Sequence, residues 1–285
     1  MTAPQQPPTG DGSSPPACYR HPGRETYVSC VRCGRPACPD CLRDASVGQQ
    51  CIDCVREGGR AQRPALTAFG GRPSRSAVVT WSLIGINVLA FIAEVARPGL
   101  FYDWAMFGPA VAAGQWYRLL TSAFTAPGTS FSGLGLVDIA FNMYALYIVG
   151  PELERLLGHA RYLALYLLSA VGGGVLYYYL QPHGLAAGAS GAVFGLFGAW
   201  FVASRRLRLD TRGIVVLIAI NLVFGFVVPN IAWQDHLGGL ATGALLTAAY
   251  AYAPRNGRQA FQVAATIAIV AAIAVAVIIR NGQLS

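Results

Sequence analysis

Seven long apolar segments constrain this chain more than any other feature of its sequence. They cover residues 77–96, 134–149, 162–180, 186–203, 214–228, 231–252 and 261–279. A helix needs about 20 residues to cross a hydrocarbon core about 30 Å thick. Charged residues make up only 12% of the 285 residues, against about 25% in soluble domains. The sequence therefore predicts an all-α polytopic membrane protein.

The arginines that flank these segments predict how the chain crosses the membrane. If the amino end is inside, three arginines flank the outer ends, Arg97, Arg118 and Arg280, and ten flank the inner ends, Arg72, Arg75, Arg155, Arg161, Arg205, Arg206, Arg208, Arg212, Arg255 and Arg258. An excess of basic residues on the cytoplasmic side is typical of multi-pass proteins. We therefore expect a plasma-membrane protein with a cytoplasmic amino end and an outer carboxyl end. All 21 basic residues are arginine, which fits a bacterium with a GC-rich genome.

The first 75 residues are polar and contain two segments without a motif. Residues 1–17 are rich in Pro, Gln, Gly and Ser and lack the basic and apolar regions of a signal peptide. They predict a disordered cytoplasmic tail. Residues 57–75 are rich in Gly and Arg and are typical of a linker that ends at a membrane surface.

Between these segments, residues 18–56 contain all seven cysteines. With one histidine they form four pairs, each separated by two residues: Cys18 and His21, Cys30 and Cys33, Cys38 and Cys41, Cys51 and Cys54. Eight such ligands complete two tetrahedral sites, so we expect two structural zinc ions. The pairs can alternate between the sites or follow one another in sequence. A disulfide framework would leave one cysteine unpaired and would need an oxidising compartment.

This cysteine segment resembles the B-box type of zinc finger, and that resemblance implies a cytoplasmic protein partner. Metal binding also changes the charge balance of the chain. Seven thiolates and two divalent ions lower the formal net charge of +8 to about +5. The basic excess is then weak support for nucleic-acid binding, which we do not expect.

A few polar residues fall inside the apolar segments, where they are costly and therefore candidates for function. They are Asp138 and Asn142 in the second segment, Ser190 in the fourth and His236 in the sixth. Counting residues from the segment starts places Ser190 and His236 roughly 8 Å below the outer boundary. Glu94, near the end of the first segment, is expected to extend to the interface.

Ser190 and His236 form a potential nucleophile and base. The Gly188-Ala189-Ser190-Gly191 sequence lies at the amino-terminal end of a predicted helix, whose amide groups and positive end favour an oxyanion. A serine needs a base to become a nucleophile, and His236 is the one histidine within an apolar segment. Glycines near both residues permit close helix packing. The alternative is that Ser190 is only a small residue at a helix crossing.

These motifs in this order resemble the rhomboid family of intramembrane serine proteases. The resemblance covers about residues 76–254 and includes the serine motif, His236-x-x-Gly239-x-x-x-Gly243, Trp116-Tyr117-Arg118, Phe141-Asn142-Met143 and Gly150-x-Glu152-Leu153-Glu154. It implies a six-helix bundle, with residues 255–285 adding a seventh transmembrane helix. The implied activity is cleavage of single-span membrane proteins near the outer face of the lipid bilayer, without a cofactor.

The resemblance also implies a role for individual residues. Ser190 is the nucleophile and His236 the base, while the Ser190 amide, Gly188 and Asn142 surround the oxyanion. Phe194 stands where the family often has a tyrosine against the histidine. Trp116 and Arg118 anchor the outer loop in the membrane interface.

One position departs from the family pattern. Asp138 stands where the family usually has a histidine that contributes to the oxyanion hole. A carboxylate would repel the oxyanion, so Asp138 either is neutral and donates a hydrogen bond, as burial favours, or orients His236. The departure also leaves open a non-catalytic scaffold that binds membrane helices, and the zinc segment could serve as an adaptor in either case.

Overall fold

A computed structural model describes residues 15–61, 66–71, 73, 76–126, 134–228 and 231–284. The chain forms two compact units, Met1–Pro64 and Ala65–Ser285. The predicted tail lies almost wholly outside the described residues, and so does part of the predicted linker, including Arg72 and Arg75.

The first unit is built from short elements around the cysteines. Two antiparallel strand pairs form it, together with a 3-10 turn and one helix: β1 (Ala17–Cys18) with β2 (His21–Glu25), β3 (Leu42–Asp44) with β4 (Gln49–Cys51), η1 (Pro39–Cys41) and α1 (Ile52–Ala61). Its buried core consists of six cysteines with Ala37 and Leu42. Such a small apolar core cannot stabilise a fold by itself, so the cysteines must contribute through their chemistry.

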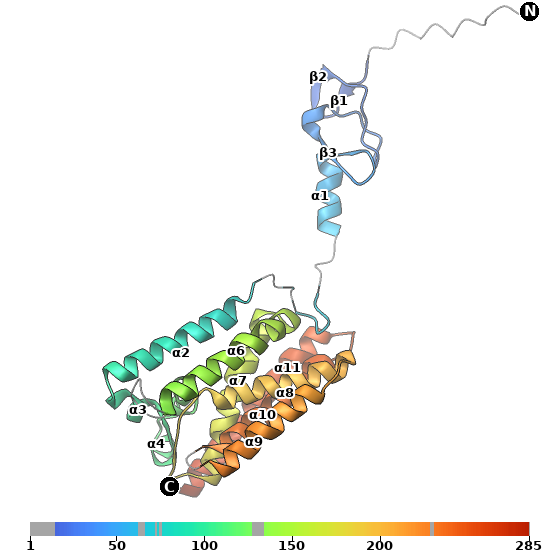
Figure 1. The fold of residues 1–285 in the computed structure, drawn as a ribbon. Coiled ribbons are helices and arrows are strands. Elements are labelled where there is room, and N and C mark those ends of the chain that lie inside the picture. The colour runs from blue at the N-terminus through green and yellow to red at the C-terminus, as the bar shows by residue number, and fades with distance from the viewer. Residues whose placement is uncertain are drawn as a thin grey trace, which may run out of the picture. The chain divides into compact units, whose positions relative to one another are not determined.

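The second unit is a bundle of long helices (Figure 1). They are α2 (Val78–Ala96), α6 (Leu134–Leu157), α7 (His159–Leu180), α8 (Ser190–Leu207), α9 (Arg212–Val227), α10 (Trp233–Ala251) and α11 (Arg258–Leu284). Each corresponds to one predicted apolar segment. The largest differences are that α6 continues to Leu157, beyond the predicted end at residue 149, and that α11 continues to Leu284, beyond the predicted end at residue 279. Helix α8 begins at Ser190 instead of residue 186.

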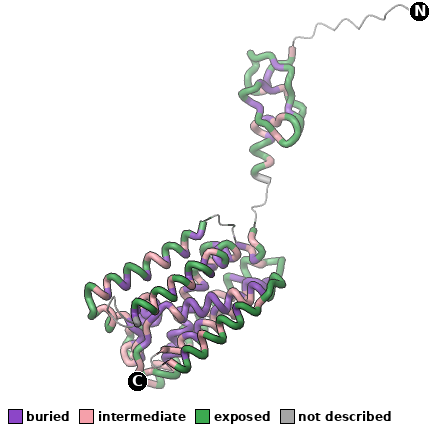
Figure 2. Tube along the Cα trace, viewed as in Figure 1, coloured by how far each residue is buried: buried purple, intermediate pink, exposed green. Residues whose placement is uncertain are grey.

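Four of the described helices, α2, α6, α7 and α11, are long and apolar enough to cross a membrane, and α9 is a shorter apolar helix. Buried positions are most frequent along α7, α8 and α10 (Figure 2). These helices are covered by their neighbours, so they can carry glycine and polar residues that a lipid-facing helix avoids. The protein is thus a helical, multi-pass membrane protein.

Glycines bring α8 and α10 into backbone contact. A Cβ atom at Gly239 would lie 1.9 Å from the Gly191 carbonyl oxygen, and one at Gly243 would lie 2.1 Å from the Gly195 carbonyl oxygen. No larger residue fits at these two positions of α10. This close approach places the amino end of α8 beside the first turn of α10.

Two polar side chains, Arg118 and Glu94, lie elsewhere than expected. Arg118 is buried, not extended into the interface, and its guanidinium donates to Gln115 Oε1 and to the carbonyls of Tyr102 and Ala105, at 2.6, 2.6 and 2.9 Å. Arg118 therefore holds the outer loop together from within. Trp116 is half exposed. Glu94 is fully buried, and its Oε2 accepts from the Ala126 amide at 3.1 Å, so the expectation that it reaches the interface is wrong.

Several short elements join α2 to α6 and α7 to α8. They are α3 (Gly99–Trp104), β5 (Met106–Phe107), α4 (Gly108–Ala112), α5 (Arg118–Thr121), η2 (Ser122–Phe124) and β6 (Leu185–Ala186). Strands β5 and β6 pair antiparallel. This pairing ties the loop before α8 to the loop after α2 and so fixes the approach of the chain to Ser190.

Candidate functional site

Ser190 and His236 are in hydrogen-bond contact. Ser190 is the first residue of α8 and His236 lies in the first turn of α10. Their Oγ and Nε2 atoms are 2.8 Å apart, the separation expected of a nucleophile and its base. The late start of α8 places Ser190 at the helix terminus, not about five residues inside the apolar segment as the sequence predicted.

The imidazole of His236 packs against an aromatic ring. Phe194, one turn after Ser190, stacks on it with ring centroids 4.2 Å apart and planes 10° apart. Its Nδ1 is buried and has no hydrogen-bond partner among the described residues. The stacking, and not a third side chain, holds the ring with Nε2 toward Ser190.

The chain before Ser190 has a backbone conformation that favours glycine at position 188. Gly188 has φ +131°, a conformation that favours glycine. Its amide donates to the Ser122 carbonyl oxygen at 2.9 Å, so that amide is not free for an oxyanion. The amides of the first turn of α8 lack partners four residues earlier in the helix. The start of α8 is therefore the donor-rich part of the site.

Asp138 and Asn142 line the same region from α6. Asn142 is buried, and its amide nitrogen donates to the Asp138 carbonyl oxygen at 3.0 Å. A Cβ at Gly188 would lie 3.4 Å from Asp138 Oδ2 and 3.5 Å from Ser190 Oγ. Both side chains also line a cavity of about 10 Å³ with Asn87 and Ala189, which is room for one water molecule.

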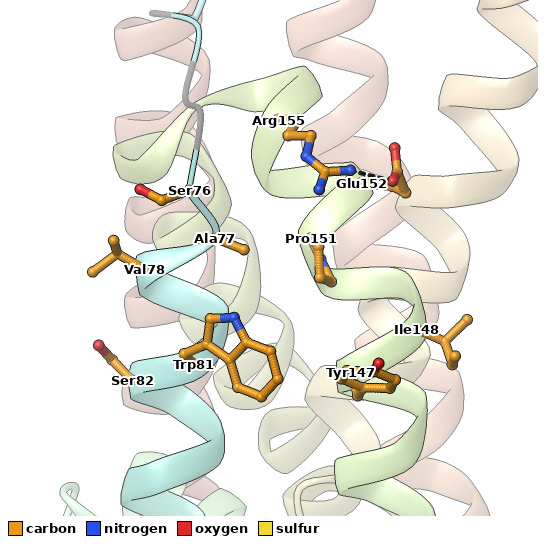
Figure 3. Close-up of a pocket in the computed structure, with 10 residues that line it drawn as sticks. All are labelled: Ser76, Ala77, Val78, Trp81, Ser82, Tyr147, Ile148, Pro151, Glu152 and Arg155. Carbon is orange, nitrogen blue, oxygen red and sulfur yellow. Dashed lines mark hydrogen bonds and ion pairs between the residues drawn. The ribbon is translucent and has the colours of Figure 1, made fainter.

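A separate groove of about 870 Å³ lies between α2 and α6 (Figure 3). Trp81 and Tyr147 face each other across it, and Arg155 and Glu152 form an ion pair at one end. Neither Ser190 nor His236 lines it. The groove therefore does not belong to the site around the serine.

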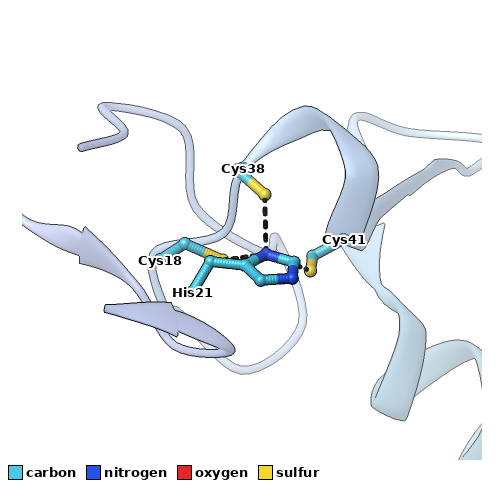
Figure 4. A group of neighbouring side chains, drawn as sticks. All are labelled: Cys18, His21, Cys38 and Cys41. Carbon is cyan, nitrogen blue, oxygen red and sulfur yellow. Dashed lines mark hydrogen bonds between the residues drawn. The ribbon is translucent and has the colours of Figure 1, made fainter. Parts of the chain in front are cut away.

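In the first unit, the cysteine pairs alternate between two clusters. One contains Cys18, His21, Cys38 and Cys41 (Figure 4), and the other contains Cys30, Cys33, Cys51 and Cys54. All ligand atoms within a cluster lie within 4.8 Å of one another. This arrangement decides between the two pairings that the sequence left open.

The donor atoms fit a tetrahedral metal ion. His21 Nδ1 lies 3.8, 3.3 and 3.4 Å from the sulfurs of Cys18, Cys38 and Cys41. Metal–ligand bonds of about 2.0–2.3 Å in a tetrahedron separate donors by roughly 3.5–3.8 Å. All seven cysteines are free thiols. Either cluster could hold one metal ion.

The surroundings of Cys30, in the second cluster, favour its thiolate form. Although burial opposes ionisation of Cys30, the backbone amides of Cys51, Cys33 and Arg32 lower the pKa of this thiol to about 6. The Cys51 amide donates to Cys30 Sγ at 3.1 Å. Metal ions bind the deprotonated form of cysteine, so these amides favour occupation of the site.

Two acidic residues that contact the bundle helices, Glu154 and Asp235, were not among the candidate site residues from the sequence. Glu154 is fully buried and accepts from the Val79 and Thr80 amides at 2.9 and 2.8 Å, which caps α2. Asp235 precedes His236 and lies against Gly191 and Gly173. A carboxylate next to an apolar run is a signal that could have identified both.

Comparisons with known proteins agree with this architecture. Residues 113–253 match the family model described as Rhomboid domain. The chain is 40% identical to Rhomboid protease GluP of Bacillus subtilis (strain 168) over 144 residues, 49% of this chain and 27% of GluP. It is 35% identical to Putative rhomboid protease YdcA of the same organism over 143 residues, 48% of this chain and 68% of YdcA.

A third relative matches over a longer segment. The chain is 28% identical to Rhomboid protease AarA of Providencia stuartii over 206 residues, 61% of this chain and 66% of AarA. The chain thus spans about a quarter of GluP and about two thirds of YdcA and AarA. On the family match and on these relatives, the chain belongs to the rhomboid family, a family of intramembrane proteases.

Proposed function

We propose that this protein is an intramembrane serine endopeptidase that uses Ser190 and His236. The observation that carries the proposal is the 2.8 Å contact between Ser190 Oγ and His236 Nε2 at the amino end of α8. A buried serine at a helix crossing needs no base, whereas a nucleophile does. The rhomboid proteases among its relatives support the same activity.

The proposed reaction proceeds through an acyl-enzyme. Ser190 Oγ attacks the carbonyl carbon of the scissile peptide bond while His236 Nε2 takes the hydroxyl proton. The tetrahedral intermediate collapses, the C–N bond breaks, and His236 returns the proton to the leaving amine. Water then attacks the ester with His236 again as base, which releases the new carboxyl end and restores the serine.

The oxyanion is stabilised from two helices in this proposal. The Ser190 amide donates from the start of α8, where the helix dipole also favours negative charge. Asn142 donates from α6 after its amide turns away from the Asp138 carbonyl oxygen, which it contacts in the resting site. Gly188 leaves room for the oxyanion because it has no Cβ.

Asp138 fits this site only as a neutral acid. Its Oδ2 lies on the same side of Gly188 as the serine hydroxyl, where a carboxylate would oppose the oxyanion. A protonated Asp138 donates a hydrogen bond instead. In the described residues it makes no hydrogen bond to His236, whose contacts are with Ser190 and Phe194, so we favour the donor role over an orienting one.

The proposed substrates are single-span membrane proteins cleaved near the outer face of the plasma membrane. Ser190 begins a helix of the membrane bundle, so the substrate segment is proposed to approach it within the bilayer. In the proposed orientation, the amino ends of α8 and α10 face outward, because the arginines at the other end of α8 mark the cytoplasmic side. The amino-terminal unit is then cytoplasmic, holds two structural zinc ions and is available to a protein partner.

A fluorophosphonate probe tests the proposed nucleophile in the full chain. We expect the wild type to be labelled and Ser190→Ala to be unlabelled, with His236→Ala labelled much more slowly. A single-span reporter should be cleaved by the wild type alone. Absence of both labelling and cleavage in a folded wild type would refute the proposal.

The position of Asp138 beside Gly188 favours one alternative function. An ionised Asp138 would disfavour the oxyanion and leave a scaffold that binds membrane helices without cleaving them. Replacement by the family's usual residue separates the two. Asp138→His should then create cleavage in an otherwise inactive protein, whereas a protease needs no such change.

A further inference from the structure

Glycines form part of the interface between α8 and α10, where Phe194 of α8 also stacks on His236 of α10. Gly239 packs on the backbone of Gly191 and Gly243 packs on that of Gly195. Knobs that insert into holes resist sliding, but glycine faces are smooth. One residue of sliding moves a helix by about 1.5 Å. Such a shift would break the 2.8 Å contact of Ser190 with His236.

Asp235 provides a polar contact across this interface. Its carboxylate occupies the space that side chains on two other helices would need. A Cβ at Gly191 of α8 would lie 2.2 Å from Asp235 Oδ2, and a Cβ at Gly173 of α7 would lie 2.5 Å from Asp235 Oδ1. The carboxylate therefore lies between α7 and α8 while its own backbone belongs to α10.

The Asp235 carboxylate lies against Gly191 at the start of α8. Gly191 is the second residue of α8, so its amide has no partner within the helix. A carboxylate at this end of a helix also interacts favourably with the helix dipole. A hydrogen bond from the Gly191 amide to this carboxylate would leave the neighbouring Ser190 amide available for the oxyanion.

We propose that Asp235 is a positioning residue that fixes the axial register of α10 on α8, and thereby the contact between His236 and Ser190. Two consecutive residues of α10 hold two consecutive residues of α8: His236 contacts Ser190 and Asp235 contacts Gly191. With only one of these two contacts, α10 could still rotate on α8 about that contact. The catalytic consequence rests on the proposed function, whereas the register itself does not.

Hydrogen exchange of the first turn of α8 tests the register without catalysis. The measurement uses the full chain in lipid nanodiscs with Ser190→Ala in every variant, and follows peptides that cover residues 188–197 by mass spectrometry. We expect Asp235→Ala to speed exchange at the start of α8 by about 10- to 100-fold, because a charge-assisted hydrogen bond is lost. Asp235→Asn keeps an acceptor oxygen and should retain most of the protection.

Cleavage of a single-span reporter by the corresponding active variants tests the catalytic consequence. Misplacement of a catalytic group by about 1 Å costs roughly 100-fold in rate. We therefore expect Asp235→Ala to lower kcat by about 10- to 100-fold with little change in KM. Asp235→Asn should recover kcat to within about fivefold of the wild type.

Thr247→Ala is the matched control, because it removes a buried side-chain oxygen without a partner from the same helix. It should leave both exchange and kcat unchanged. Wild-type exchange in Asp235→Ala overturns the proposal, and so does an Asp235→Asn variant that exchanges as fast as Asp235→Ala. If Asp235→Ala does not fold, Asp235→Leu, which keeps a similar side-chain volume without an acceptor oxygen, takes its place in both measurements.

The two proposals fail in different ways. A wild type that neither reacts with fluorophosphonate nor cleaves the reporter removes the protease, while faster exchange in Asp235→Ala still supports the register contact. Normal cleavage by folded Asp235→Ala leaves the protease in place and removes the positioning role.

Discussion

At the residue scale, the candidate site consists of a reactive pair of side chains and an aromatic ring that packs against one of them. Ser190 obtains its base from another helix, and His236 obtains its orientation from the Phe194 ring. A buried polar group is costly without a partner, yet His236 Nδ1 has none among the described residues. In the proposed reaction Nδ1 carries the proton of the neutral imidazole, and Nε2 takes the second proton from Ser190. The site is thus proposed to act as a pair and not as a triad.

Asp138→Asn tests the neutral donor role at the residue scale. If protonated Asp138 donates to the oxyanion, wild-type cleavage should fall as the pH rises and the carboxyl group ionises. The amide of Asp138→Asn donates at every pH, so this decline should disappear. The measurement is reporter cleavage from about pH 5 to 9 in a fixed lipid composition.

An unchanged pH profile in Asp138→Asn would contradict both the donor role and the orienting role of Asp138. Asn142→Ala serves as the companion variant, because it removes the other side-chain donor from α6. It should lower kcat by about 10²- to 10³-fold, the usual loss for one oxyanion donor, and leave the pH profile in place.

At the scale of elements, two contacts place the helices that carry the site. Glycines let α8 and α10 approach to backbone contact, and Glu154 at the end of α6 caps the start of α2. The spacing of the glycines predicted the first contact, whereas the sequence gives no sign that Glu154 reaches the start of α2. Packing therefore decides which glycines and carboxylates are structural.

Gly239→Ala should destabilise the bundle. Its Cβ would meet the Gly191 carbonyl oxygen at 1.9 Å, so the helices must separate at a cost of about 1–3 kcal/mol. Labelling of Ser190 by the fluorophosphonate probe should also slow, because α8 and α10 no longer approach each other as closely. Thermal unfolding in detergent measures the change.

Gly213→Ala is the control for this substitution, because a Cβ at Gly213 meets no atom within 4 Å. It should leave the unfolding midpoint unchanged or raise it slightly, since alanine favours a helix over glycine. Equal midpoints for the two variants would contradict the packing at Gly239.

Glu154→Ala should also destabilise the protein. It removes the acceptor for the Val79 and Thr80 amides and for the Thr80 hydroxyl, and unsatisfied buried groups cost about 1–3 kcal/mol each. Glu152→Ala is a close match in sequence, but its pair with Arg155 is half exposed and worth about 0–1 kcal/mol. The prediction is wrong if both variants unfold at the same temperature.

At the scale of the whole molecule, the two units have different sources of stability. The amino-terminal unit has little apolar core beyond its cysteines, whereas the helical unit buries large side chains such as Tyr162, Tyr166 and Leu196. Loss of metal should therefore affect one unit only. Metal removal therefore tests the amino-terminal unit while the helical unit stays intact.

A strong chelator should release about two zinc ions per chain and unfold the amino-terminal unit. Metal analysis measures the stoichiometry, and limited proteolysis should then cut between Cys18 and Cys54 while the helical unit stays resistant. Cys18→Ser should reduce the content to about one ion. A metal-free chain whose amino-terminal unit still resists proteolysis would contradict structural zinc.

The sequence by itself determined the elements and the candidate chemistry. Apolar length predicted each long helix because crossing a bilayer sets a minimum span, and paired ligands predicted two metal clusters because spacing sets which donors can converge. The rarity of polar residues in apolar segments identified Ser190, His236, Asn142 and Asp138 as candidates. Each of these inferences depends on local pattern alone.

Only the tertiary structure decided which groups meet. It paired the cysteines in alternation, started α8 at Ser190, buried Glu94 and Arg118, and placed Asp235 against Gly191. These outcomes depend on contacts between residues far apart in sequence, where packing and the need to satisfy buried polar groups override local preference. The 2.8 Å contact between Ser190 and His236 is one of them, because it exists only where two glycine-faced helices touch.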